Sequence, residues 1–482
     1  MITKKTKPTN KLKLLPVFLA MSVIPLYVQS ADWKIAPGIS IEQIYTDNAN
    51  LDTDEESESI TRLKPRISIY RRGARASVDL RYAPQYRHYW QETQSNEVIH
   101  FLKADGDIEL VKDHFFIDGW ASADQHTINS NSKTGIDSVT GSDDLTEVYT
   151  AGISPYLVSQ LGTYATIEAR YGLNRVEYAD DNLDSSTGHR VDLVLGSGRS
   201  VKAMPWELRL EQSRIDYVDL DEDDKVSRVR GEAAYKLNRQ WALAAALGYE
   251  EYELSQNEDS DGEIWSVGFI FTPSPRTRLA AGFGERSFGD DYYLNLSYRS
   301  QRTVWTADYQ RDFISARDEV IRPSLFNRQD AFGDMVRDPV LSNPVSATRS
   351  GPALDEGHYL LEAFHTNVVF STSRTSLSLS ARYSEREYEE SLLPQDSTDF
   401  SLSGQFTRKI RSNLSGTLGV SWIDHQEDLS DYEQWSASIG GIYNLGPKTS
   451  LRLNLSHLER DATLAALSYT ENRASLSLNK SW

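Results

Sequence analysis

The sequence contains no cysteine, so disulfide bonds contribute nothing to its stability. It has one long apolar run, from Leu14 to Val28, and without a second such run it cannot cross a membrane as a bundle of helices. Its 51 basic residues are outnumbered by 70 acidic ones, and the formal net charge of -19 argues against nucleic acid as a partner. The 25 Tyr and 10 Trp fit either a membrane barrel with a polar interior or a secreted β-protein.

The N-terminal segment predicts export from the cytoplasm. Five lysines between positions 4 and 13 precede the apolar run, and the small residues Val28 and Ser30 suit cleavage before Ala31. We therefore expect residues 1–30 to be a secretory signal peptide and residues 31–482 to form a single domain. The run is too short for a comfortable membrane span, and Pro16 and Pro25 interrupt it.

The rest of the chain alternates between apolar and polar residues with the period of a β-strand. In the last segment, Leu476 and Leu478 alternate with Ser475 and Ser477. Similar segments recur from residue 33 to Trp482, including single strands expected at 74–90 and 96–111. The pattern predicts an all-β protein of about 22 strands, with 18 or 20 as alternatives.

The connections distinguish a membrane barrel from a soluble sandwich, which the alternation alone does not. Short basic turns, such as Ser373-Arg374 and Pro447-Lys448, alternate with longer acidic loops, such as 52–58, 129–144 and 219–224. An up-and-down antiparallel barrel in a membrane segregates turns and loops in this way, whereas a Greek-key sandwich does not. The sequence therefore predicts a transmembrane up-and-down antiparallel β-barrel in the cell outer membrane.

Two short motifs near the start of this barrel carry a family resemblance. The first expected strand begins with Pro37-Gly38-Ile39-Ser40 and reaches Tyr45-Thr46-Asp47-Asn48, and Tyr- and Arg-rich strands follow. The chain thereby resembles the family of outer-membrane barrels called β-barrel porin 2, which is associated with exosortase and exopolysaccharide gene clusters. The resemblance implies a barrel that passes a polysaccharide across the outer membrane or supports its export.

Charged residues opposite the apolar faces are the candidates for lining the lumen. Charges of both signs in a pore favour hydrated polar solutes, although such residues also pair across strands and stiffen the wall. The candidate lumen-lining residues are Arg75, Asp79, Arg81, Arg87, Glu168, Arg170, Glu207, Arg209, Arg382 and Arg452.

The connection from 318 to 357 is the longest irregular segment. It contains four prolines together with Arg322, Arg328 and Arg337, and a loop of this length without a strand pattern is often functional. Two placements are open: a constriction folded into the barrel, or an external flap.

The partners expected from this interpretation are those of an outer-membrane protein. Leu476, Leu478 and the terminal Trp482 resemble the signal by which the barrel assembly machinery recognises its substrates. Lipid and lipopolysaccharide would surround the wall, and a polysaccharide and a periplasmic export protein are further candidate partners. No cofactor or metal is expected. No HExxH or Gly-x-Ser-x-Gly motif indicates an enzyme.

We therefore expect a pore that serves the export or passage of exopolysaccharide or other polar solutes. The alternative is a structural or binding barrel that engages polysaccharide or a partner lipoprotein without an open pore. Trp and Tyr side chains such as Trp241 and Trp435 would stack on sugar rings or anchor the barrel at the membrane interfaces.

Overall fold

The computed structural model describes residues 33–129, 132–141, 145–180, 182–218, 223–254, 260–321, 358–388, 396–427 and 430–482. The predicted signal peptide lies outside these residues. The described chain is almost entirely strand, with one short helix, α2 (Ala316–Ile321), and one 3-10 turn, η3 (Ala465–Leu467). The strands are β1 (Lys34–Thr46), β2 (Glu58–Arg72), β3 (Ala76–Tyr82), β4 (Gln85–Tyr89), β5 (Glu97–Ile99), β6 (Leu102–Val111), β7 (Phe115–Thr127), β8 (Leu145–Leu161), β9 (Ala165–Tyr178), β10 (Ser186–Ser197), β11 (Trp206–Tyr217), β12 (Asp223–Lys236), β13 (Trp241–Glu253), β14 (Ser260–Ser274), β15 (Thr277–Arg286), β16 (Gly289–Arg299), β17 (Thr303–Ser315), β18 (His358–Ser371), β19 (Thr375–Tyr388), β20 (Ser397–Arg411), β21 (Leu414–Glu427), β22 (Tyr432–Gly446), β23 (Thr449–Ala462) and β24 (Tyr469–Ser481).

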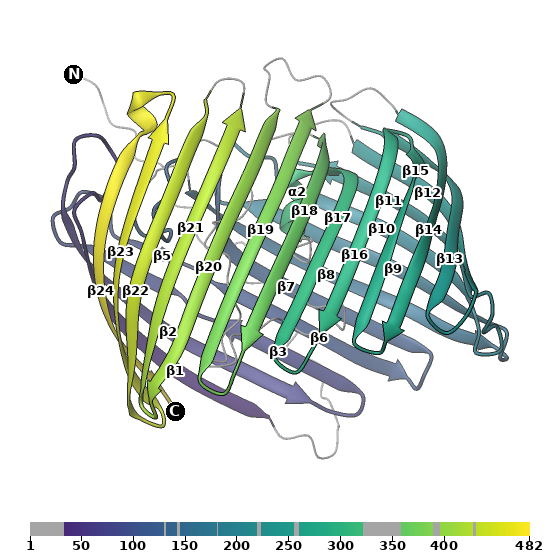
Figure 1. The fold of residues 1–482 in the computed structure, drawn as a ribbon, viewed down its shortest axis with the longest axis horizontal. Coiled ribbons are helices and arrows are strands. Elements are labelled where there is room, and N and C mark those ends of the chain that lie inside the picture. Colours follow the sequence, from purple (N-terminus) through teal and green to yellow (C-terminus); the bar gives the residue numbers. More distant parts are fainter. Residues whose placement is uncertain are drawn as a thin grey trace.

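Neighbouring strands pair antiparallel around the whole molecule, and β1 pairs with both β2 and β24, which closes the barrel (Figure 1). β3 and β4 pair with β2 in one continuous register, as do β6 and β5 with β3 and β4, so each pair of segments is one interrupted strand. Pro84, which has no N–H to donate to the sheet, lies in the first interruption. The 24 segments therefore make 22 strands, as the sequence predicts.

The outer surface of the barrel is apolar. Leu247 keeps 71% of its surface exposed and Val420 keeps 62%, although both are large hydrophobic side chains. A soluble protein would bury such residues, whereas the wall of a membrane barrel turns them to lipid. Trp241 and Trp435 also lie on this exposed face, where the Nε1 of Trp435 donates to Glu459 at 2.9 Å. Among the described residues, no helix is both long enough and apolar enough to span a bilayer.

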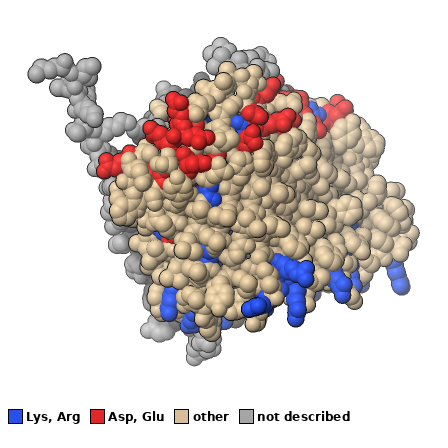
Figure 2. Space-filling view, turned by 60° about the vertical axis from the view of Figure 1, so that its left-hand side comes forward, with Lys and Arg blue, Asp and Glu red and all other residues tan. Residues whose placement is uncertain are grey.

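The two rims of the barrel differ in charge. Figure 2 shows Asp and Glu side chains gathered at one rim and Lys and Arg at the other. The acidic rim carries the long connections and the basic rim carries the tight turns, as expected. The expected strict alternation of long and short connections is wrong at two places. On the basic side, the connection 198–205 between β10 and β11 is longer than the acidic-side connections 179–185 and 218–222 that flank it. β15 and β16 are joined on the acidic side by only Ser287 and Phe288, and Gly289 adopts a φ of 94° after them.

Candidate functional site

The interior face of the barrel has two chemically different sectors. On the side of β7 to β12, charged residues pair across strands, as in Arg170 with Asp118 at 2.7 Å. On the side of β19 to β22, small hydroxyl side chains dominate the middle of the wall. Ser380 and Ser403 are hydrogen-bonded at 2.6 Å and Ser421 and Ser436 at 2.7 Å. The middle of the wall from β19 to β22 is therefore polar with few charges, whereas ion pairs line the wall from β7 to β12.

A segment between β7 and β8, residues 132–141, folds into the barrel, and we call it the inserted loop. Its Asp137 accepts two hydrogen bonds from Arg473 of β24, at 2.5 and 2.8 Å. The other wall contact is Arg62 of β2, whose Nη1 lies 2.9 Å from Asp137 Oδ2. Both arginines are buried, so one carboxylate links two strands to the loop.

The neighbouring residues of the inserted loop fix it further. The Nη1 of Arg87 donates to the carbonyl oxygen of Ser138 at 2.5 Å, and the hydroxyl of Tyr89 donates to the carbonyl oxygen of Val139 at 3.0 Å. The side chain of Val139 packs in a buried apolar cluster that includes Ile60 and Tyr89. Satisfied backbone oxygens and apolar packing show that the loop is docked on the wall.

The charge of Asp137 is stabilised by its surroundings. Burial raises the pKa of Asp137, but the guanidinium groups of Arg473 and Arg62 outweigh it and hold that pKa well below its usual value. The carboxylate still keeps 34% of its surface exposed, so it lies at the edge of open space in the barrel rather than in a closed core.

The helix α2 crosses the interior from a different part of the wall, next to β17. It follows β17, yet the Nε of its Arg317 donates to Ser186 of β10 at 2.6 Å, and the same side chain contacts Asn174 of β9. Its Val320 packs against Val176 of β9. These contacts place the helix against a wall seven or more strands away from its own, since β9 and β10 precede β17 by that number.

The same helix is also tied to the wall beside its own strand. Glu319 lies 3.5 Å from Arg386 of β19, which in turn pairs with Asp399 of β20 at 3.1 Å. His425 of β21 contacts Asp399 at 2.9 Å. All four side chains are buried, so α2 is a strut between two parts of the wall near the acidic rim.

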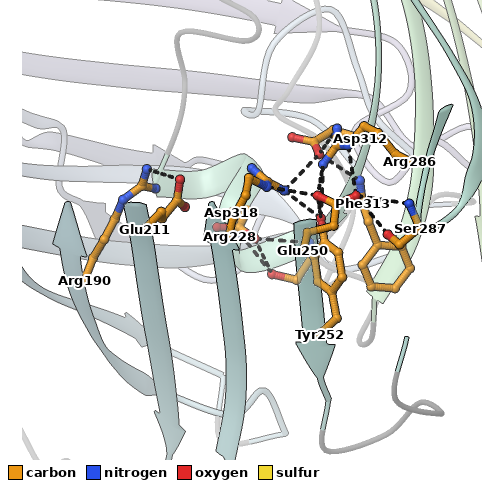
Figure 3. A network of polar contacts seen from close by, with 11 residues as sticks. Arg190, Glu211, Arg228, Glu250, Tyr252, Arg286, Ser287, Asp312, Phe313 and Asp318 are labelled. Carbon is orange, nitrogen blue, oxygen red and sulfur yellow. Dashed lines mark hydrogen bonds and ion pairs between the residues drawn. The ribbon is translucent and has the colours of Figure 1, made fainter. Parts of the chain in front are cut away.

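A network of ion pairs reinforces the wall from β12 to β17. Glu250 of β13 is fully buried and receives the Nη2 of Arg286 at 2.8 Å and the Nε of Arg228 at 2.9 Å (Figure 3). Arg286 also pairs with Asp312 at 3.1 Å, and the Ser287 hydroxyl donates to Glu250 at 2.9 Å. Every oxygen of Glu250 thus has a partner, which marks this network as structural.

A pocket opens on the inner face where β2, β3 and β6 meet. Its volume is about 480 Å³, in the range of small-molecule sites. Its charged lining residues are Arg66, Arg81, Lys103 and Asp124, and apolar and aromatic residues such as Ile67, Tyr82 and Phe101 complete the lining. Arg81 pairs with Asp79 at 3.0 Å, and both side chains remain half exposed.

Register places most of the residues expected to line the lumen on the inner face. Nine of them occupy strand positions whose side chains face inward: Asp79, Arg81, Arg87, Glu168, Arg170, Glu207, Arg209, Arg382 and Arg452. Arg75 does not belong with them, because it lies in the tight turn before β3 at the basic rim. Glu168 with Arg170 and Glu207 with Arg209 pair along their own strands at 3.1 and 2.9 Å. A selectivity role for any of these residues stays a prediction.

The remaining candidates fall into two groups. Leu476 and Leu478 are exposed on the outer face of β24, and Trp482 is exposed beyond its end. Their position suits contact with lipid, and their role as an assembly signal stays a prediction. Arg322, Arg328 and Arg337, the residues of the expected constriction, lie outside the described residues, so only the first part of the 318–357 segment, in α2, is placed.

Sequence reasoning missed the inserted loop. Residues 129–144 were expected to be one more acidic external loop, but residues 132–141 lie against the inner wall. The signal available in the sequence was the pair of β-branched residues Ile136 and Val139, which flank Asp137 in an otherwise polar segment. Across the described ranges, no group of three or more His, Asp and Glu side chains is arranged to hold a metal ion.

Comparison with known proteins shows the fold. No protein-family model matches the sequence, and no curated protein matches it either. Among solved structures, the chain is similar to the FrpB iron transporter of Neisseria meningitidis, with a TM-score of 0.52, 9% identity, and coverage of 92% of this chain and 82% of that one. It is also similar to a mutant of the ferric enterobactin receptor PfeA of Pseudomonas aeruginosa, with a TM-score of 0.51, 9% identity, and coverage of 93% and 80%. A third is the siderophore receptor PiuA of Acinetobacter baumannii, with a TM-score of 0.50, 10% identity, and coverage of 93% and 82%.

These similarities overturn the function expected from the sequence. The similar barrels are siderophore receptors and an iron transporter, not exopolysaccharide exporters or porins. An exopolysaccharide export pore is therefore the wrong expectation for this chain. Membership of the β-barrel porin 2 family stays a prediction.

Proposed function

We propose that this protein is an outer-membrane barrel of the receptor type, which admits a small polar ligand into its lumen from the side of the acidic rim. The inserted loop and α2 narrow the entrance until the ligand displaces one of them. The observation that carries the proposal is that both segments come from the acidic side and are held inside the barrel by ion pairs to its wall. The receptors and the transporter of similar fold support the uptake direction.

The chemistry of the contacts favours a releasable closure. Apolar packing under the inserted loop comes from two side chains: Val139 lies in one buried apolar cluster, and the partly buried Ile136 packs against another. Most of its attachment is electrostatic, through Asp137 and the Arg87 contact to Ser138. Ion pairs at the edge of water exchange readily for pairs with a ligand, whereas a large apolar core would not.

The outer surface of the barrel supports a position in the outer membrane. The exposed apolar band supports insertion in a bilayer, with lipid and lipopolysaccharide around the wall. Residues 1–30 would direct export, and the barrel assembly machinery would recognise the end of β24 with Leu476, Leu478 and Trp482. The acidic side would then face outward and the basic turns would face the periplasm.

Conductance of the mature protein in planar bilayers tests the closed entrance. We expect a small conductance for the wild type and a several-fold larger one for a variant carrying Asp137→Asn with Arg317→Ala, which loosens both segments. Glu253→Gln, at an exposed pair with Lys225, is the matched control and should behave as the wild type. A large steady conductance in the wild type, or no increase in the double variant, would contradict the proposal.

A further inference from the structure

A row of cations runs down the inner wall from the inserted loop to the pocket, and we call it the basic track. Alternate residues of β2 share one face, which places Arg62, Lys64 and Arg66 in line. The neighbouring strands extend this row. Arg87 lies opposite Arg62, and Arg81 lies opposite both Ser68 and Lys103. Like charges placed directly opposite in a sheet are destabilising, so the arrangement needs a reason.

The upper end of the basic track is already neutralised. Arg62 pairs with Glu42 at 2.6 Å and with Asp137 at 2.9 Å. Arg87 pairs with Glu97 at 2.9 Å. Arg473 of β24 joins this end through its two hydrogen bonds to Asp137. One of these partners, Asp137, belongs to the inserted loop rather than to the wall.

The lower end is not neutralised in the same way. Arg66 and Lys103 form no ion pair with any carboxylate of the described residues, and Arg81 has one, with the half-exposed Asp79. All three cations line the 480 Å³ pocket, against one lining carboxylate, Asp124. A cavity of this size with three cationic lining residues is suited to binding a small anion.

We propose that the basic track binds a small organic polyanion, and that Asp137 occupies its upper end as a built-in substitute for a carboxylate of that ligand. The forked contact of Asp137 with Arg473 is the geometry in which arginine recognises carboxylates. An entering polyanion competes with Asp137 for Arg62 and Arg473 and settles against Arg66, Arg81 and Lys103. The inference rests on the proposed uptake function, to which it adds the ligand class and the trigger for opening.

Isothermal titration calorimetry tests the inference by measuring the affinity for citrate. The refolded full chain is titrated in detergent at low ionic strength. We expect citrate to bind the wild type and to bind Asp137→Asn about tenfold more tightly, because the competing charge is removed. Arg66→Gln with Lys103→Gln should weaken binding about tenfold or more. Arg382→Gln, an inner-face arginine outside the pocket, is the matched control and should leave the affinity unchanged.

Three results would overturn the proposal: no citrate binding by either the wild type or Asp137→Asn, unchanged binding by the Arg66→Gln with Lys103→Gln variant, or equal binding of neutral sorbitol. Gel mobility of unheated and heated samples checks that each variant is folded. The conductance experiment tests the closed entrance in the absence of citrate. A missing citrate signal with the expected conductances therefore rejects the ligand class while leaving the closed entrance intact.

Discussion

At the scale of single residues, the buried carboxylate of Glu250 joins two cations of the wall. It has no exposed surface and holds both Arg228 and Arg286, so its loss leaves two partly buried guanidinium groups without their shared anion. We expect Glu250→Ala to lower the free energy of unfolding by about 3–5 kcal/mol, the range for breaking a buried ion pair. The midpoint of a guanidinium unfolding titration, followed by tryptophan fluorescence in vesicles, measures the change.

Glu253, three residues further along β13, supplies the matched control for this prediction. It pairs with Lys225 at 2.9 Å, but both side chains are more than a third exposed. Glu253→Ala should cost at most about 1 kcal/mol. Equal losses for the two variants would show that the network around Glu250 is not the source of wall stability.

Arg87 shows what a single sequence reveals about a residue and what it does not. The period of the strand predicts that Arg87 lies on the inner face, and in the structure it lies opposite Arg62 of β2. Its partners were not predictable, because Ser138 lies 51 residues away in a loop whose path no local pattern determines. Periodicity gives the side on which a residue lies, whereas its contacts depend on long-range packing.

At the scale of elements, docking of the inserted loop should depend on pH through Asp137. Arg473 and Arg62 lower its pKa, whereas Glu42 and Glu471, which also face it, act in the opposite sense. Because the pKa is lower in the docked state than the usual value of about 3.9, the stabilisation is complete above that value and is lost as the pH falls through the docked pKa. Docking should therefore be constant between about pH 5 and 7 and weaken below about pH 4.

Hydrogen exchange of peptides from 132–141, corrected for the intrinsic pH dependence, measures this docking. Wild-type protection should fall only on strong acidification. Asp137→Asn should show low protection at every pH, since it cannot form the charged contacts with Arg62 and Arg473. A protection step between pH 5 and 7, or a protected Asp137→Asn loop, would rule out Asp137 as the anchor.

The strands and the segments inside the barrel differ in how far the sequence predicts them. Each strand carries its own alternation, and even the interrupted strand at Pro84 was expected as one strand from 74 to 90. Insertion into a barrel has no such local period. Length and proline content drew attention to 318–357, but the short segment around Asp137 contacts the wall with fewer than ten residues. Its insertion depends on cations that β2, β4 and β24 bring together only after the barrel closes.

At the scale of the whole molecule, the apolar outer band makes a test of membrane insertion possible with two adjacent residues of β21. Val420 lies at the middle of the strand on the outer face and is 62% exposed, whereas Ser421 faces inward and bonds to Ser436. An arginine on the lipid side at this depth costs about 2–4 kcal/mol, because its charge leaves water for hydrocarbon. An arginine at 421 enters the polar interior, where it loses one hydroxyl contact, which is worth about 1 kcal/mol.

We therefore expect Val420→Arg to shift the unfolding midpoint in phospholipid vesicles well below that of Ser421→Arg. The comparison cancels changes in strand propensity and net charge, since the two variants add the same side chain one residue apart on one strand. In detergent micelles, which deform around a charge, the difference between the variants should shrink. If Ser421→Arg were the more destabilising variant in vesicles, residue 421 rather than 420 would face lipid. The inner and outer faces assigned to every strand would then have to be exchanged, because one continuous register links all the strands.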